Sequence, residues 1–287
     1  MIYFPNAKIN IGLYITEKRT DGFHNLESIM VPLTGILFDA MEIISIPSSA
    51  IPQEKEKRKA KLLISGIPVS TDAENNLCIK AYNLLAKDFS LPSIKIYLHK
   101  IIPMGAGLGG GSSDGAFMIK LLNEKFNLEL SEQKMLHYAS QLGSDCSFFI
   151  FNQPAFISGR GEKIIPLSCN GEKKLNLNGC NIAIVYPNIS ISTAEAYSHI
   201  IPKKIKVHLS KLISQPIEKW KHTIHNDFED VVFPKHPAIK HIKEKLYSLG
   251  AIYASMSGSG SAVYGIFHKK TDIEKNFPSC FVKVGQL

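Results

Sequence analysis

Closely spaced cysteines are absent from this sequence. Its five cysteines lie far apart, and no two of them form a C-x-x-C pair; they are Cys78, Cys146, Cys169, Cys180 and Cys280. Such scattered cysteines exclude a disulfide framework and a zinc module built on C-x-x-C pairs. We therefore expect reduced thiols and a cytoplasmic protein.

Long hydrophobic runs are also missing. A membrane-spanning helix needs roughly 18 or more apolar residues in succession, and no stretch of the sequence reaches that length. The apolar start "MIYFPNAKINIGLYI" is interrupted by Lys8 and Asn10, and no small-residue cleavage site follows it. We expect neither a targeting segment nor a membrane partner.

Acidic residues are outnumbered by basic ones. The 33 Lys and Arg residues against 25 Asp and Glu give a formal net charge of +8, which favours an anionic partner. No stripe of interleaved basic and aromatic residues indicates a nucleic-acid-binding module, so we expect a phosphorylated small molecule instead. The mixed-charge run from Gln53 to Lys61 is predicted to be a solvated loop.

Apolar residues, at 45% of the chain, are numerous enough for a large core. Alternation from Ala7 to Thr16 predicts a half-buried strand that carries Lys8 and Asn10 on one face. Further strands are predicted at residues 41–46, 61–64, 94–99, 182–186 and 262–267. Helices are predicted from near Ser112, from Ser131 to a stop at Gly143, and at residues 193–200 and 237–249.

The order of these elements, with strands in runs and helices in runs, predicts an α+β fold. A turn-rich stretch, "PAFISGRGE" from Pro154, interrupts the pattern near the middle of the chain. We take it as a boundary between an N-terminal domain of residues 1–156 and a C-terminal domain of residues 157–287.

A glycine-rich segment, "PMGAGLGGGSSDG" from Pro103 to Gly115, has six glycines in thirteen residues. Glycine lets backbone N–H groups approach a ligand closely, and the positive end of the following helix attracts anions. Ser112 and Ser113 add hydroxyl groups that could hold a phosphate oxygen or Mg²⁺. The segment therefore predicts a phosphate-binding loop rather than a flexible linker.

Two other phosphate-binding motifs fit this segment less well. Gly105, Gly107 and Gly110 satisfy G-x-G-x-x-G, but the loop does not follow a first buried strand as a dinucleotide fold requires. Gly105 and Gly110 have Walker A spacing, but Gly111 replaces the motif's lysine. A protein-kinase loop is excluded because neither H-R-D nor D-F-G is present.

The glycine-rich segment resembles the nucleotide loop of the GHMP small-molecule kinases. Other stretches resemble one branch of them, the 4-diphosphocytidyl-2-C-methyl-D-erythritol kinases: "AKINIGLYITEKRTDGFHNLES" from Ala7, "LGSDCSFF" from Leu142, "NDFE" from Asn226 and "SGSGSAVYG" from Ser257. The resemblance spans nearly the whole chain. It implies a GHMP fold with two domains, each with a mostly antiparallel sheet and helices. It also implies that the protein uses ATP and Mg²⁺. The implied reaction phosphorylates the 2-hydroxyl of the cytidylylated methylerythritol in non-mevalonate isoprenoid synthesis.

The resemblance also assigns catalytic roles, to Lys8 and Asp145. An aspartate can accept the alcohol proton during phosphoryl transfer, and a nearby cation keeps that aspartate ionised. No side chain is assigned as a metal ligand. The implied nucleotide loop comprises Pro103, Met104, Gly105, Ala106, Gly107, Leu108, Gly109, Gly110, Gly111, Ser112 and Ser113.

Substrate contacts are implied in the same way. The family sandwiches the cytosine between two aromatic rings, which fall on Phe23 and Tyr197, and contacts the edge of the base with a histidine, which falls on His24. Asn10 and Thr193 are the implied contacts to the methylerythritol part. Stacking of this kind contributes roughly 1 to 3 kcal/mol per base.

Three residues depart from the family pattern. Phe23 stands where tyrosine is usual, Gly115 where alanine is common, and Ser147 where proline is usual, and none of these changes removes a group that the mechanism needs. Two alternatives stay open: another GHMP kinase of mevalonate or homoserine type, and a nucleotide-binding regulator without catalysis. A monomer and a homodimer both fit the sequence.

Overall fold

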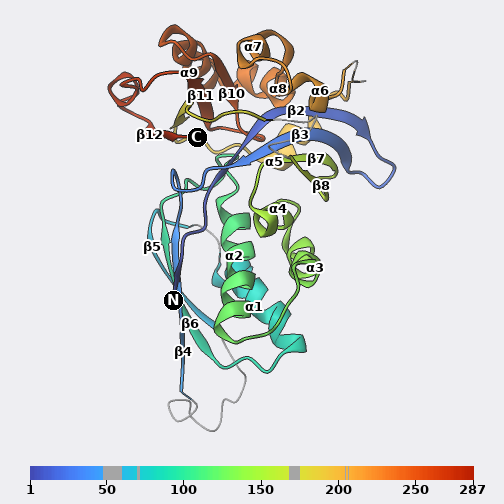
Figure 1. Cartoon of the computed structure of the whole chain (residues 1–287), viewed down its shortest axis with the longest axis vertical. Helices are drawn as coiled ribbons and strands as arrows, with labels where there is room; N and C mark the ends of the chain where they lie inside the picture. The colour runs from blue at the N-terminus through green and yellow to red at the C-terminus, as the bar shows by residue number, and fades with distance from the viewer. Residues whose placement is uncertain (48–59, 70–71, 168–174, 204, 206) are drawn as a thin grey trace. The chain divides into compact units, whose positions relative to one another are not determined.

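A computed structural model describes residues 1–47, 60–69, 72–167, 175–203, 205 and 207–287 (Figure 1). The predicted loop from Gln53 to Lys61 lies outside these residues except for its last two positions. None of the described helices combines the length and the apolar composition that a membrane crossing requires.

The chain packs into two compact units, each built from separate segments. Unit 1 contains Met1–Ala7, Leu37–Pro103 and Gly109–Asn152, and unit 2 contains Lys8–Ile36, Met104–Leu108 and Gln153–Leu287. The domain division at residue 156 stays a prediction. The compact units change close to it, after Asn152, but the early segment Lys8–Ile36 packs with the C-terminal half.

Unit 1 contains one four-stranded sheet with the order β1-β4-β6-β5. Strand β6 alternates between buried and exposed residues, as predicted from its sequence. It pairs with β4 in antiparallel fashion and with β5 in parallel fashion. The strands are β1 (Ile2–Tyr3), β4 (Ala40–Ser45), β5 (Ala60–Gly66) and β6 (Ile94–Lys100).

The helices of unit 1 include both that were predicted after the glycine-rich segment. The hydroxyl of Ser131 accepts a hydrogen bond from the Lys134 amide at the start of α3, and Gly143 follows its last residue. Helix α2 begins at Gly110, two positions before Ser112, and it packs against α1 (Figure 1). The elements are η3 (Ala73–Asn75), α1 (Leu77–Asp88), α2 (Gly110–Lys125), α3 (Glu132–Leu142) and α4 (Cys146–Phe151).

Unit 2 contains two antiparallel sheets, with the orders β2-β3-β7-β8 and β10-β11-β9-β12. Strands β2 and β3 form a long hairpin, drawn in blue in Figure 1. The strands of the first sheet are β2 (Lys8–Lys18), β3 (His24–Pro32), β7 (Ala155–Gly159) and β8 (Lys163–Pro166). Those of the second are β9 (Asn181–Tyr186), β10 (Tyr253–Met256), β11 (Val263–Phe267) and β12 (Phe281–Gln286).

The helices of unit 2 are short apart from α9, which packs its buried Ile239, Ile242 and Leu246 against β10 and β11. The elements are α5 (Thr193–Ser198), α6 (Leu209–Leu212), η4 (Ile217–Lys219), α7 (Trp220–Thr223), α8 (Phe228–Lys235), α9 (Pro237–Ser248) and η5 (Glu274–Asn276). Antiparallel sheets together with helices confirm the predicted α+β class.

Two local predictions were wrong. The stretch from Pro154 is not a turn-rich crossing: it forms β7, because its apolar residues pair with β3 and are buried. Strand β2 is not half-buried, since every residue from Lys8 to Ile15 is buried. A bulge at Gly12 lets Leu209 and Ile224 approach the strand, where a Cβ atom on Gly12 would lie within 3 Å of both side chains.

Candidate active site

The first half of the glycine-rich segment, Met104–Leu108, is fastened within unit 2 through its carbonyl groups. The side chains of Ala106 and Leu108 are also buried, so the segment is anchored and not a flexible linker. The hydrogen bonds that hold its backbone include Lys8 N to Leu108 O (2.9 Å), Ser257 Oγ to Gly107 O (2.9 Å), Ala262 N to Ala106 O (3.1 Å) and Tyr186 Oη to Met104 O (3.4 Å).

Gly107 cannot be replaced without moving the backbone around it. Its φ of +75° lies in the left-handed region, and a Cβ atom would meet the carbonyl oxygen of Ser257 at 2.0 Å. That distance is far below van der Waals contact, so only glycine fits this approach of two backbone segments. The "SGSGS" stretch and the glycine-rich segment therefore approach each other backbone to backbone at this point.

The second half of the segment opens α2 in unit 1. The amides of Gly110, Gly111 and Ser112 lie in the first turn, where no preceding helical carbonyl can accept from them. The hydroxyl of Ser113 is completely buried and has no hydrogen-bond partner among the residues that the structure describes. The start of α2 therefore offers amide donors and one unused hydroxyl group.

Helix α2 is tied to the sheet of unit 1 by a buried polar cluster around Lys100. Lys100 Nζ at the end of β6 contacts the carboxylates of Asp39 and Asp114, the second at 2.6 Å. Burial raises the pKa of the Asp114 carboxyl, the Lys100 ammonium lowers it, and Asp39 raises it further, so that the pKa is about 8. Because Asp114 lies in the second turn of α2, this cluster helps to fix the start of the helix.

Asp145 immediately precedes α4 in unit 1 and is half-buried. An aspartate at this position usually caps the helix, but the Asp145 side chain makes no capping hydrogen bond. Ser147, which departs from the family pattern, is buried in the first turn of α4. Asp145 therefore precedes α4 without capping it through a side-chain hydrogen bond.

Lys8 and Asn10 share one face of β2, as predicted, but both are buried, at 3% and 1% exposure. Lys8 Nζ donates to Asn10 Oδ1 at 2.6 Å, and Asn10 Nδ2 donates to Ser28 Oγ at 2.7 Å. Ser28 Oγ in turn donates to the carbonyl of Gly12 at 2.7 Å. A chain of hydrogen bonds thus orients the buried Lys8 ammonium.

The predicted base-binding residues lie in unit 2, but not as one sandwich. The ring stacked on Tyr197 is that of His24, with centroids 5.3 Å apart and an angle of 29°. Phe23 is 55% exposed, and the guanidinium of Arg160 lies 4.9 Å from its centroid. Burial and the charge of Lys18 lower the pKa of His24, so its imidazole is neutral at pH 7 and can both donate and accept a hydrogen bond.

Thr193, the remaining predicted contact, begins α5 and is exposed. Its hydroxyl lies 3.0 Å from that of Ser259 in the "SGSGS" stretch. Thr193 and the glycine-rich turn that follows β10 are therefore neighbours in unit 2.

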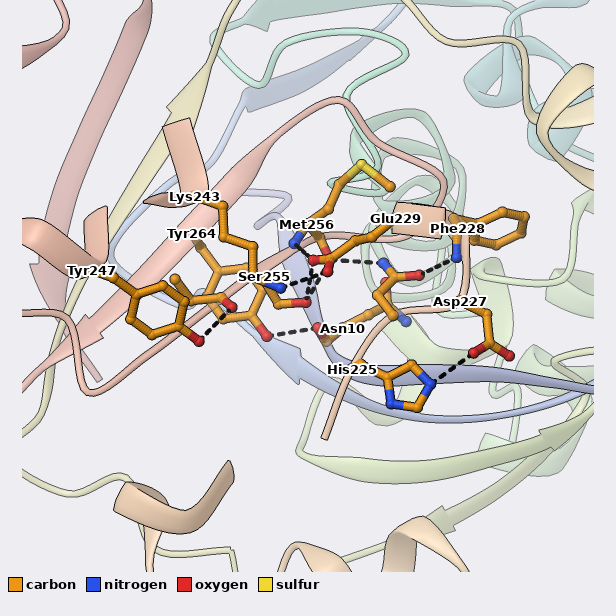
Figure 2. A network of polar contacts seen from close by, with 12 residues as sticks. Asn10, His225, Asp227, Phe228, Glu229, Lys243, Tyr247, Ser255, Met256 and Tyr264 are labelled. Atoms are coloured by element: carbon orange, nitrogen blue, oxygen red, sulfur yellow. Dashed lines mark hydrogen bonds and ion pairs between the residues drawn. The ribbon is translucent and has the colours of Figure 1, made fainter. Parts of the chain in front are cut away.

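Sequence reasoning missed the polar residues that support this site. The side-chain amide of Asn10 bonds to Ser28, and the backbone carbonyl of Asn10 accepts from the hydroxyl of Tyr264. The side chain of Asn226 bonds to the turn after β10. Figure 2 shows Tyr264 directed toward Asn10, and the Tyr264 hydroxyl donates to Asn10 O at 2.7 Å. All three lie in stretches that carry the family resemblance, but their supporting contacts join segments far apart in the sequence.

Two family models match the chain. The model described as GHMP kinases N terminal domain matches residues 76–160, and the model described as GHMP kinases C terminal matches residues 209–276. The first match includes the whole glycine-rich segment and Asp145, and the second includes the "NDFE" and "SGSGS" stretches.

Curated relatives are similar over almost the full chain. A 4-diphosphocytidyl-2-C-methyl-D-erythritol kinase of Bacteroides fragilis is 49% identical over 282 residues, which cover 98% of this chain and 97% of the relative. The protein of the same name from Bacteroides thetaiotaomicron is 50% identical over 267 residues, which cover 93% and 92% of the two chains.

Solved structures agree with the fold. A crystal structure of 4-(cytidine 5'-diphospho)-2C-methyl-D-erythritol kinase superimposes with a TM-score of 0.75 at 25% identity and covers 99% of this chain and 98% of that one. The mevalonate kinase of Methanococcus jannaschii has a TM-score of 0.71 at 15% identity, and the match covers 100% of this chain and 98% of that one. At this low identity, the likeness supports the fold alone. With two relatives near half identity over nearly full length, the chain belongs to the 4-diphosphocytidyl-2-C-methyl-D-erythritol kinase family of GHMP kinases.

Proposed function

We propose that this chain uses ATP to phosphorylate the 2-hydroxyl of 4-diphosphocytidyl-2-C-methyl-D-erythritol in isoprenoid precursor synthesis. The observation that carries this proposal is the 49% identity, over 98% of the chain, to a relative named for that kinase. A mevalonate or homoserine kinase is less well supported, because the solved kinases of those names are only 13% to 16% identical.

The glycine-rich loop, Pro103 to Ser113, is the proposed site for the phosphates of ATP. The carbonyls of Ala106, Gly107 and Leu108 are already bonded to protein groups, which favours the N–H side of the backbone as the side that faces a ligand. Its second half supplies the first-turn amides of α2, whose dipole favours negative charge. Both features suit a polyphosphate.

Mg²⁺ is the proposed metal partner of ATP, and the residues present fit it. The buried hydroxyl of Ser113, which has no hydrogen-bond partner in the described part of the chain, is an oxygen ligand of the kind that Mg²⁺ accepts. This ion commonly takes only one or two protein ligands beside substrate phosphates. When bound, the ion would neutralise charge on the phosphate oxygens.

Asp145 and Lys8 are the proposed catalytic residues. Phosphoryl transfer depends mainly on positioning and charge stabilisation, so one carboxylate beside the acceptor hydroxyl is enough to receive the proton as the new O–P bond forms. We assign that role to Asp145, whose carboxylate does not cap α4. The buried Lys8 ammonium, oriented by Asn10, would keep the carboxylate ionised and align the γ-phosphate.

Phe23, His24 and Tyr197 are the proposed cytosine contacts, with Asn10 and Thr193 facing the methylerythritol part. The large exposed face of Phe23 suits stacking on a base. Because the His24 ring stacks on Tyr197, the base must displace it to reach that face of Tyr197, and His24 would then meet the edge of the base.

The reaction is also proposed to take place in the cytoplasm. In the described part of the chain, Cys78, Cys146, Cys180 and Cys280 are all free cysteines. Free thiols are the normal state of cysteine in that compartment.

A coupled assay for ADP tests the proposal. The purified chain is offered ATP with three alcohols in turn: 4-diphosphocytidyl-2-C-methyl-D-erythritol, mevalonate and homoserine. We expect ADP release with the cytidylyl alcohol alone. Turnover of mevalonate or homoserine without turnover of the cytidylyl alcohol contradicts the proposal, and ATP binding without any turnover supports a non-catalytic regulator instead.

A further inference from the structure

The "NDFE" stretch, Asn226 to Glu229, has no role in the mechanism described above. Its three polar side chains are nevertheless buried and hydrogen-bond to backbone groups of unit 2. Asn226 and Glu229 bond to the end of β10 and the turn after it, and Asp227 bonds to β2. Buried polar groups that are fully paired commonly fix a unique local arrangement. The contacts of this stretch indicate which arrangement it fixes.

Asn226 uses both ends of its side-chain amide. Nδ2 donates two hydrogen bonds, to the carbonyls of Met256 and Gly258, each at 2.8 Å. Oδ1 accepts from the amide of Phe228 at 3.0 Å. The side chain therefore stabilises its own turn and, through its two N–H groups, grips the backbone turn that follows β10.

Ser257, the residue between those two carbonyls, contacts the proposed active site. Its hydroxyl donates to Gly107 O at 2.9 Å and accepts from the amide of Asn10 at 3.3 Å. The turn that Asn226 holds is therefore bonded to the glycine-rich loop on one side and to the strand of Lys8 on the other.

This contact leaves little free space. A Cβ atom on Gly107 would lie 2.0 Å from Ser257 O, and one on Gly258 would lie 3.2 Å from Gly107 O. Close-packed backbone segments cannot shift separately, so a displacement of the turn must displace Gly107 as well.

The rest of the stretch fastens the surrounding strands. Glu229 Oε1 accepts from the amide of Met256 at 2.8 Å, and its other oxygen pairs with Lys243 at 2.5 Å. Asp227 Oδ2 accepts from the amide of Ile15 at 2.7 Å in β2. With β10 and β2 secured separately, the amide of Asn226 is the part of this stretch that acts on the turn itself.

We infer that Asn226 is a positioning residue for ATP: by holding the carbonyls of Met256 and Gly258, it sets the position of Gly107 through Ser257. The inference rests on the proposed function to the extent that Met104–Leu108 binds the nucleotide. Asn226 acts through other residues and does not itself contact the substrates.

The test is Asn226→Asp, which has the same shape. The new carboxylate still accepts from Phe228 N but offers no hydrogen to the two carbonyls. The affinity for a non-hydrolysable ATP analogue is measured by calorimetry, well below the melting temperature of each variant. We expect a loss of about tenfold or more, the equivalent of about 1.4 kcal/mol.

Ser255→Ala is the matched control. Ser255 is also completely buried and precedes Met256. Its hydroxyl donates to Glu229 and, at 3.3 Å, to the carbonyl of Met256, but no hydrogen bond joins it to Gly258 or Gly107, and Asn226 still holds both carbonyls when this hydroxyl is removed. We expect a comparable loss of thermal stability and a change in analogue affinity of less than about twofold. Equal losses of affinity in both variants would mean that Asn226 is merely structural, and the inference would be wrong.

A double-mutant cycle with Ser257→Ala tests the route. If Asn226 acts through Ser257, the double variant should lose scarcely more affinity than Asn226→Asp alone, whereas additive losses would overturn the inference. If Asn226→Asp does not fold, Asn226→Ser takes its place, because a serine hydroxyl can still accept from Phe228 N but is too short to reach the turn.

The assay separates this inference from the proposed function because no alcohol is present. A wild-type protein that binds the analogue but does not phosphorylate the cytidylyl alcohol contradicts only the proposed function. If the wild type binds the analogue and Asn226→Asp binds it equally tightly, only the inference is contradicted. Failure of the wild type to bind the analogue at all contradicts both.

Discussion

The hydroxyl of Ser257 donates a hydrogen bond to the carbonyl of Gly107, a residue 150 positions earlier in the chain. The two backbones approach so closely at this point that no side chain fits between them. A glycine-rich loop that would be mobile by itself is thereby held as a fixed surface.

Gly107→Ala is expected to destabilise the protein. The new methyl group would meet Ser257 O at 2.0 Å, and the left-handed backbone would be strained. We expect the free energy of unfolding to fall by at least about 2 kcal/mol, measured by urea denaturation. Gly111→Ala is the control, because Gly111 has open space around it within the first turn of α2. This substitution should raise the free energy of unfolding by no more than about 1 kcal/mol. Equal effects would refute the packing argument.

Asp145→Asn should preserve ATP binding and lower turnover by at least about a hundredfold, because an amide cannot accept the alcohol proton. Steady-state ADP release measures the turnover, and calorimetry with an ATP analogue measures the binding. Undiminished turnover would remove Asp145 from the catalytic residues.

Phe23→Ala should weaken the binding of the cytidylyl alcohol by roughly 1 to 3 kcal/mol and leave the affinity for ATP unchanged. Phe4→Ala is a matched control, since Phe4 is 54% exposed against 55% for Phe23 and lies in unit 1. It should alter neither affinity. The two Michaelis constants of each variant provide the comparison, and parallel losses for both ligands in Phe23→Ala would indicate a structural role.

The raised pKa of Asp114 predicts a pH-dependent stability. Between its ordinary value of 3.8 and about 8, the folded protein keeps a proton on Asp114 that the unfolded chain has released. The stability that this retained proton provides is fully present below pH 3.8 and is lost as the pH rises. The free energy of unfolding then falls with a slope of up to about 1.4 kcal/mol per pH unit.

Asp114→Asn removes this titration. Urea denaturation at several values between pH 5 and pH 8 should therefore give a flatter profile for the variant than for the wild type. Identical slopes would show that Asp114 is already ionised in the folded protein at pH 5.

The sequence was a good guide wherever local patterns decide structure. Helix α3 was predicted from the Ser131 cap to the Gly143 stop, because capping depends only on neighbouring residues. Alternation placed Lys8 and Asn10 on one face of β2. It did not reveal that this face is buried, because the residues that cover it come from distant segments.

The supporting residues of the site were beyond reach for the same reason. Nothing near Asn226 in the sequence indicates that its amide bonds to the carbonyls of Met256 and Gly258. The pairing of Lys100 with Asp39 and Asp114 likewise joins residues that are far apart in the chain. Family resemblance assigned the groups that would meet the substrates, but not the groups that hold them in position.

The discontinuous composition of unit 2 affects how the protein is made. The hairpin of β2 and β3 leaves the ribosome early, but its partner β7 begins only at Ala155, about 120 residues after Ile36. At about 5 to 20 residues per second, the edge of β3 waits roughly 6 to 24 s for its neighbour. A nascent chain with an unpaired apolar edge is a natural client for chaperones, and a fragment that ends before β7 would be prone to aggregate.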